Sequence, residues 1–247
     1  MLAPLALSFA FLTWRESVVG MKPSEMVQMD IRRTWDIAPQ SSVGGNVGMI
    51  LGGGVESETL GYVRWRMRNE VLFNRPVHVL RSEGYDKKAS ALSVEEVWTD
   101  AEGDLVRQRD EKTTLAGKQT GDATFYKDHI ELTRSDARGK SSFAEVNPAG
   151  GMEEVQRRFH PMEGDRKEFL RLDAVAGSFR KVVIEKKGHF RGTWGGDAYE
   201  GPAYRFSVDG QEQTAMLTSE DEIVQIALSR SVALVLAGPT KSRRKAD

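Results

Sequence analysis

The feature that most constrains the fold is an alternation of residue types within residues 61–80. In its clearest part, Val63, Trp65 and Met67 alternate with three arginines. A period of two places the apolar side chains on one face of a β-strand and the arginines on the other. A helical period would spread the arginines around the cylinder and leave no apolar stripe. The alternation therefore predicts a strand with one buried face and one solvated face.

Similar runs recur along the chain and are separated by turn residues such as Asp209-Gly210. One helix is expected at residues 151–160, where acidic residues begin the segment and arginines end it. We therefore predict a mainly β protein, a large antiparallel meander that forms a curved sheet, half-barrel or open barrel with one short helix. The other expected strands are 26–37, 92–98, 105–109, 130–133, 169–172, 181–185, 204–208, 222–228 and 231–236.

Residues 1–13 are mostly apolar and include no charged side chain. Such a run suits the apolar part of a secretory signal and is shorter than the roughly 20 residues that a membrane-spanning helix needs. No basic residue precedes it and Pro4 interrupts it, so a buried or surface-docked segment is the alternative. We expect an exported protein, periplasmic or extracellular. Its expected parts are an apolar or signal segment (1–20), a single β-rich domain (21–240) and a basic tail (241–247).

Composition excludes several classes of protein. The 35 basic residues are balanced by 36 acidic ones, whereas nucleic-acid binders normally carry a net positive charge or a dense basic stripe. We therefore expect no nucleic-acid partner. The chain has no Cys, which excludes disulfide scaffolds, zinc fingers, thiol catalysis and anchoring through an acylated cysteine.

Six glycines lie within residues 44–54. Glycine-rich loops bind phosphate at a helix N-terminus or in a strand-turn-helix unit, but here an acidic segment, 55–58, follows and no helical pattern comes after it. An ordered or mobile loop is the plain interpretation. The sharper one is an apolar lid, in which Met49, Ile50 and Leu51 touch a ligand or a membrane.

A second glycine-rich segment, 192–201, contains Trp194 and resembles the Gly-x-Trp signature of lipocalin-like barrels. In those families the motif opens the barrel, whereas too little chain follows it here to form one. The segment could stack and hydrogen-bond a sugar, or it could be a turn with a packed tryptophan.

No catalytic or metal-binding motif stands out. No two of the four His are spaced as a helical metal pair, and no Gly-x-Ser-x-Gly elbow is present. Ser178 and Lys181 match the Ser-x-x-Lys pattern, but the apolar run after them predicts a strand instead of the required helix start. Glu95 and Glu96 would point to opposite faces of a strand, and we interpret both as solvated charges. We expect no catalytic residue, metal or cofactor.

The export-like start, the absence of Cys, the long antiparallel meander and the single mid-chain helix resemble periplasmic β half-barrels related to lipoprotein carriers and their uncharacterised relatives. The resemblance is architectural and covers roughly residues 26–237. It implies a curved sheet whose concave apolar face, closed by a helix or loop, receives an acyl chain or other amphiphile.

We therefore expect a non-enzymatic exported β protein that binds an apolar or amphiphilic ligand, such as a lipid, or an envelope partner. The alternatives are a structural or assembly protein without a small-molecule site and, less favoured, a hydrolase. The basic residues of 241–245 predict a disordered end or a weak peripheral contact with a membrane surface. The candidate ligand-binding residues are Val63, Trp65, Met67, Met49, Ile50, Leu51 and Trp194.

Overall fold

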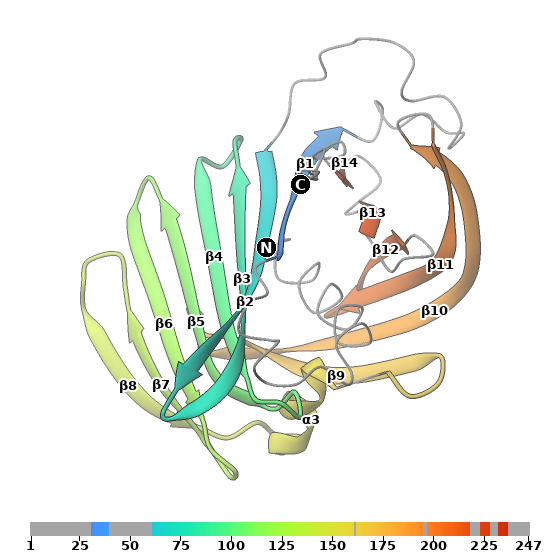
Figure 1. Ribbon diagram of the computed structural model, residues 1–247. Helices are drawn as coiled ribbons and strands as arrows, with labels where there is room; N and C mark the ends of the chain where they lie inside the picture. The colour runs from blue at the N-terminus through green and yellow to red at the C-terminus, as the bar shows by residue number, and fades with distance from the viewer. Residues whose placement is uncertain are drawn as a thin grey trace, which may run out of the picture.

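The structure, a computed structural model, describes residues 31–39, 61–160, 162–194, 197–217, 223–227 and 232–236, with side chains described for 61–160, 162–189 and 204–210. These ranges contain fourteen strands, one short α-helix and one 3₁₀ turn (Figure 1). In chain order they are β1 (Ile31–Pro39), β2 (Gly61–Leu72), β3 (Arg75–Asp86), β4 (Ala91–Thr99), β5 (Leu105–Thr114), β6 (Gly117–Phe125), β7 (Ile130–Ser135), β8 (Ser141–Val146), α3 (Met152–Gln156), η2 (Arg157–Phe159), β9 (Arg166–Asp173), β10 (Ser178–Trp194), β11 (Asp197–Val208), β12 (Gln211–Leu217), β13 (Ile223–Ala227) and β14 (Val232–Leu236).

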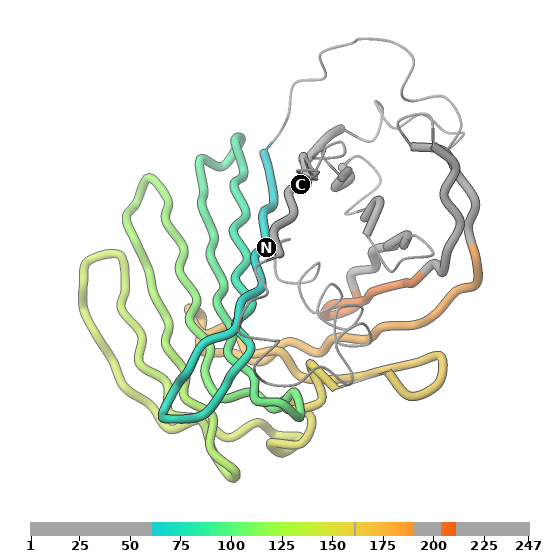
Figure 2. Tube along the Cα trace, in the orientation of Figure 1, coloured from blue at the N-terminus to red at the C-terminus, as the bar shows by residue number. Residues whose placement is uncertain are grey.

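All the described strands belong to one antiparallel sheet, in the order β8-β7-β6-β5-β4-β3-β2-β1-β14-β13-β12-β11-β10-β9. We call β2 to β8 the first wall and β9 to β13 the second wall. The pair β1 and β14, which we call the seam, joins them in the middle of the sheet. Figures 1 and 2 show the sheet curving so that the two walls face each other. The predicted fold class, a mainly β meander forming a curved sheet with a short helix, is confirmed.

Turn chemistry explains several of the hairpins. Two four-residue turns begin with Asp and end with Gly, and in them the Gly103 N–H donates to the Asp100 carbonyl and the Gly139 N–H donates to the Asp136 carbonyl. Asp209 adopts a φ of 48°, a left-handed conformation that Asp tolerates better than most residues. Each tight turn reverses the direction of the chain, so the strand that follows it pairs antiparallel with the strand before it.

The structure also differs from the sequence-based expectations. The run at residues 61–80 is a hairpin of β2 and β3, which turns at Phe73 and Asn74 with φ values of 49° and 60°. Strands β6, β8 and β12 were not predicted, because their sequences are polar or glycine-containing and lack apolar alternation. Their backbone groups pair with neighbouring strands whatever their side chains are.

The main core lies on the concave side of the first wall. There the inward side chains of β2 to β7 meet α3, η2, β9, β10 and β11 in one apolar cluster. The helix contributes Val155 and η2 contributes Phe159, both fully buried. Burying a side chain of the size of Phe159 stabilises a fold by about 1.5–3 kcal/mol. The helix predicted at residues 151–160 is therefore confirmed, and it closes part of the concave face.

Strand β9 crosses close to the inner side of β5 and β6. A Cβ atom added to Gly121 of β6 would lie 2.2 Å from the backbone carbonyl of Ala174, just after β9, so only glycine fits this contact. The side-chain amide of Gln156 pairs with both backbone groups of Leu105, at 2.5 Å and 3.2 Å. The first contact holds the far edge of the second wall against the inside of the first, and the second contact holds α3 against β5.

Candidate functional site: the concave face and its buried ion cluster

The candidate residues on β2 all face the concave side. Val63, Trp65 and Met67 are buried and belong to the same apolar cluster as Leu80 of β3 and Phe206 of β11. The alternating arginines face the opposite side of the sheet, as the period of two predicts. The first and second walls thus contribute apolar side chains to one inner surface.

The remaining candidate residues lie wholly or partly outside the described part of the chain. Met49, Ile50 and Leu51 lie outside the described residues. Trp194 is the last residue of β10, where its backbone pairs with that of Asp197, and its side chain also lies outside the description.

A cluster of charged side chains is buried beside the apolar surface. Glu95 of β4 is 3% exposed and accepts a two-pronged contact from Arg158 of η2, at 2.9 Å from Nη1 to Oε1 and 3.0 Å from Nη2 to Oε2. Arg171 of β9 donates to the same Oε1 from Nε and Nη2, both at 3.3 Å. One carboxylate therefore joins three separate elements, and the paired charges offset the cost of burial.

Gln108 and Asp110 of β5 extend the cluster along the sheet. The Gln108 Nε2 donates to both oxygens of Asp110, at 3.0 Å and 2.9 Å, and to the carbonyl of Leu172 at 2.9 Å. Asp110 Oδ2 also accepts the backbone N–H of Ala174 at 2.8 Å. Two side chains of the first wall thus bind the backbone at the end of β9.

The two buried carboxyl groups titrate differently because they face different neighbours. Burial by itself would raise the pKa of Glu95, but the guanidinium groups of Arg158 and Arg171 outweigh it and hold that pKa below its usual value. For Asp110, burial and the negative charge of Glu95 raise the pKa to about 7. Glu95 therefore stays ionised, whereas Asp110 changes charge near neutral pH.

Lys167 of β9 connects the same region to the end of η2. This lysine is 7% exposed, and its Nζ donates to the carbonyl of Arg158 at 3.1 Å and to the carbonyl of His160. Carbonyls at the end of a helical turn lack partners within the turn, and a lysine supplies one.

The interpretation of Glu95 as a solvated charge is wrong. Glu95 and Glu96 do point to opposite faces of β4, but only Glu96 lies on the outer face, where Arg68 Nη2 contacts it at 2.7 Å. Glu95 faces inward and is buried because Arg158 and Arg171, distant in the sequence, come to meet it. No local pattern around Glu95 encodes those partners.

Other residues considered for chemistry lie outside this cluster. Ser178 begins strand β10, so the Ser-x-x-Lys match lacks the helix start that its chemistry requires. The half-exposed His160 pairs with Asp104 at 2.6 Å, and His129 pairs with Asp128 at 2.8 Å. The hydrogen bond that the His129 ring donates to the Asp128 carboxylate raises the pKa of His129. Both pairs lie in or beside surface turns, open to solvent.

The outer face of the second wall carries a small charged cavity of about 160 Å³. At its centre Glu185 contacts Arg166 and Arg205, and its lining also includes Val183 and Ser207. Both arginines are paired with this carboxylate, which leaves the cavity without a strong preference for an anion. It is unlike the elongated apolar cavity expected of a lipid carrier.

Across the described ranges, no group of three or more His, Asp or Glu side chains is placed to hold a metal ion. In the same part of the chain, no helix is long and apolar enough to cross a membrane.

The chain matches no protein-family model and no curated protein. Two solved structures align with it. One is the crystal structure of a β-barrel-like protein of the domain of unknown function DUF1849 from Brucella abortus, with 11% identity, a TM-score of 0.43, and coverage of 84% of this chain and 98% of that one. The other is a DUF1089 family protein from Pseudomonas aeruginosa, with 13% identity, a TM-score of 0.36, and coverage of 70% and 92%. We transfer no functional residue from either protein.

Proposed function

We propose that this protein is an exported, non-enzymatic carrier whose concave face binds an apolar or amphiphilic molecule such as a lipid. The observation that carries the proposal is the shared inner surface, to which Trp65 and Met67 of the first wall and Phe206 of the second all contribute. Curved antiparallel sheets with apolar interiors are a common way to enclose apolar ligands. An acyl chain would extend along this surface beyond the part that α3 and η2 cover.

The likeness to lipoprotein carriers belongs to this proposal. It is supported by the curved sheet and by the short helix packed against the concave side. Within the same proposal, export follows from the apolar segment at residues 1–13, and the lid at Met49, Ile50 and Leu51 would close over the ligand.

Two tryptophans on opposite faces of the first wall allow a matched test. Trp65 faces inward with the main cluster, whereas Trp98 of β4 packs on the outer face, where its Nε1 donates to Glu70 at 3.2 Å. A fatty acid brominated along its chain quenches tryptophan fluorescence only on close approach. We expect quenching in the wild-type protein and in Trp98→Phe, and a clear reduction in Trp65→Phe.

Equal quenching in the two variants, or none in the wild type, would contradict the proposal. A second measurement is native mass spectrometry of the protein purified from its own host. The expected result is a co-purified lipid. Recovery of the unliganded protein alone, under conditions that preserve a known lipid complex, would argue against the proposed function and for a structural role.

A further inference from the structure

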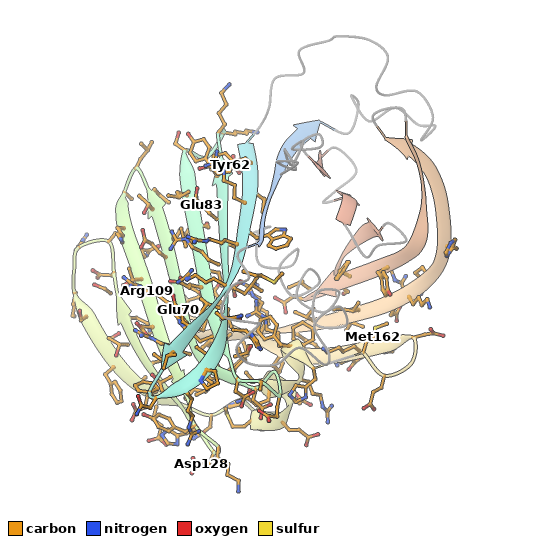
Figure 3. The ribbon with its side chains drawn as sticks, in the orientation of Figure 1. Tyr62, Glu70, Glu83, Arg109, Asp128 and Met162 are labelled. Atoms are coloured by element: carbon orange, nitrogen blue, oxygen red, sulfur yellow. The ribbon has the colours of Figure 1, made fainter. Side chains whose placement is uncertain are left out.

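The two ends of the first wall differ in charge. Because its strands are antiparallel neighbours, the turns 86–91, 114–117 and 135–141 lie along one end, and the turns 72–75, 99–105 and 125–130 lie along the other. We call the first set the basic rim and the second set the acidic rim. In Figure 3, Tyr62 and Glu83 lie toward the basic rim, and Asp128 lies in the acidic rim.

The basic rim carries four basic side chains and two carboxylates, Asp86 and Asp136. Each carboxylate accepts backbone N–H groups of its own turn, from Ala89 in the first case and from Arg138 and Lys140 in the second. The carboxylates are therefore oriented into their turns. The basic side chains are all exposed: Lys87, Lys88, Arg138 and Lys140.

The acidic rim has the opposite balance, with two basic residues, Arg75 and Lys127, and four carboxylates. The formal charges of the turns are plus two on one rim and minus two on the other, so the two rims form an electric dipole along the strands. A dipole of this kind orients a protein near a charged surface. The four acidic residues are Asp100, Glu102, Asp104 and Asp128.

An apolar side chain projects from the middle of the basic rim. Leu115 is 91% exposed at the turn between β5 and β6, so it contributes almost nothing to the core. The neighbouring turns are close, because a Cβ atom on Gly117 would lie 2.8 Å from the carbonyl oxygen of Ala137. With strands about 4.8 Å apart, the three turns span roughly 20 Å, so charges in adjacent turns lie within about one screening length of each other.

We propose that the basic rim docks on an anionic lipid surface, with Leu115 entering the boundary between headgroups and acyl chains and the acidic rim pointing away. A lipid surface fits better than a nucleic acid because the three turns hold no aromatic side chain on which a base could stack and only four basic residues, and the neighbouring Tyr62 is hydrogen-bonded to Glu83. The acidic rim also has an exposed apolar side chain, Phe73, but its carboxylates would be repelled by the same surface. This docking does not depend on ligand binding at the concave face.

Sedimentation of the full chain with vesicles tests the proposal. We expect binding to vesicles that contain phosphatidylglycerol, weaker binding at high salt, and little binding to pure phosphatidylcholine. Each basic residue near such a surface contributes about fivefold, so reversal of two in Arg138→Glu/Lys140→Glu should weaken binding by on the order of 100-fold or more. Leu115→Ser should weaken it by roughly tenfold.

Matched controls come from the acidic rim. Arg75→Glu/Lys127→Glu changes the net charge by the same amount, and Phe73→Ser removes an exposed apolar side chain. Both should retain binding within about twofold, because charges far from the surface are screened. Thermal unfolding of each variant checks that the fold is intact.

Several results would overturn the proposal. Equal loss in both double variants would mean non-specific attraction, and full binding by the basic-rim variants would mean that another part of the chain attaches to lipid. Binding of the wild-type protein to a DNA duplex or an acidic protein, but not to vesicles, would assign the rim to that partner instead. Failure of the vesicle test leaves the bromine-quenching test of the concave face unaffected.

Discussion

Two carboxylates in this molecule have similar partners and opposite surroundings. Glu95 lies between Arg158 and Arg171 inside the curved sheet, and Glu185 lies between Arg166 and Arg205 on its outer face. At the outer site, hydrogen bonds from Lys187 and Arg205 lower the pKa of Glu185 to about 2. The pKa of Glu95 is also lowered, but there the arginines must first overcome burial.

The comparison shows that the contribution of an ion pair to the stability of the fold depends on whether the pair is buried or exposed to water. Water solvates the outer charges whether or not they are paired, so pairing adds little to the free energy of folding. The inner charges have little water around them, so each depends on its partners. The inner cluster also joins β4, η2 and β9, whereas the outer one joins strands that the sheet already pairs.

The largest effect is expected when an inner partner is removed. Arg158→Met should leave Glu95 with the longer contacts from Arg171 and Gln108 and lower the free energy of unfolding by about 3–5 kcal/mol. Urea denaturation measures this loss. The control is Arg157→Met, because Arg157 is exposed and pairs with the exposed Glu153 on the same helical segment. Equal stability of the two variants would show that burial of the ion pair is unimportant.

A smaller effect is expected from pH. The pKa of Asp110 rises from 3.8 to about 7 in the folded protein, so between those values the folded state holds a proton that the unfolded chain releases. Stability should therefore fall as pH rises across this window and level off above it. Relative to Asp110→Asn, the wild type should lose on the order of 2 kcal/mol between about pH 5 and about pH 8.

Denaturation of both proteins at the two pH values checks this slope. Glu95 acts in the opposite direction, because its lowered pKa supplies stability that is lost only as pH falls below 4.5. Parallel pH profiles for the wild type and Asp110→Asn would mean that Asp110 is not the titrating group.

The smallest effect is expected at the outer site. Glu185→Gln removes the central charge of the surface group but leaves the backbone pairing of β10 with β9 and β11. The urea midpoint should not change measurably, and the small change that salt causes in the wild type should disappear. A large loss of stability would show that the ion pairs of Glu185 with Arg166 and Arg205 hold the second wall together.

The sequence predicts those parts of the fold that depend on local patterns. Alternation at Val63, Trp65 and Met67 predicted the strand and its buried face, and the Asp209-Gly210 pair predicted the turn between β11 and β12. The helix at residues 151–160 followed from its spacing and charges. Strands β6 and β8 could not be predicted in this way, because their polar side chains carry no period that separates two faces.

The buried cluster lay beyond local patterns for a different reason. Arg158 looked like a basic residue at a helix end, and its contact with Glu95 spans 63 positions of sequence. One signal was present. Gln108 and Asp110 are at inward-facing positions of β5, next to Glu95 on β4, where apolar residues would be expected. Polar residues in the buried phase of adjacent strands indicate a shared buried network.

The seam gives the molecule a particular order of assembly. Strand β1 is paired with β14, so Trp35 lies opposite Leu236 at nearly opposite ends of the described chain. The hairpins of each wall need only local contacts and can form early, but the pairing between β1 and β14 requires almost the whole chain to have been synthesised. A partly made chain can therefore build separate walls but cannot complete the single curved sheet. The pairing of β1 with β14, which joins the two walls, is therefore a late event in folding, because the two strands lie so far apart in the sequence.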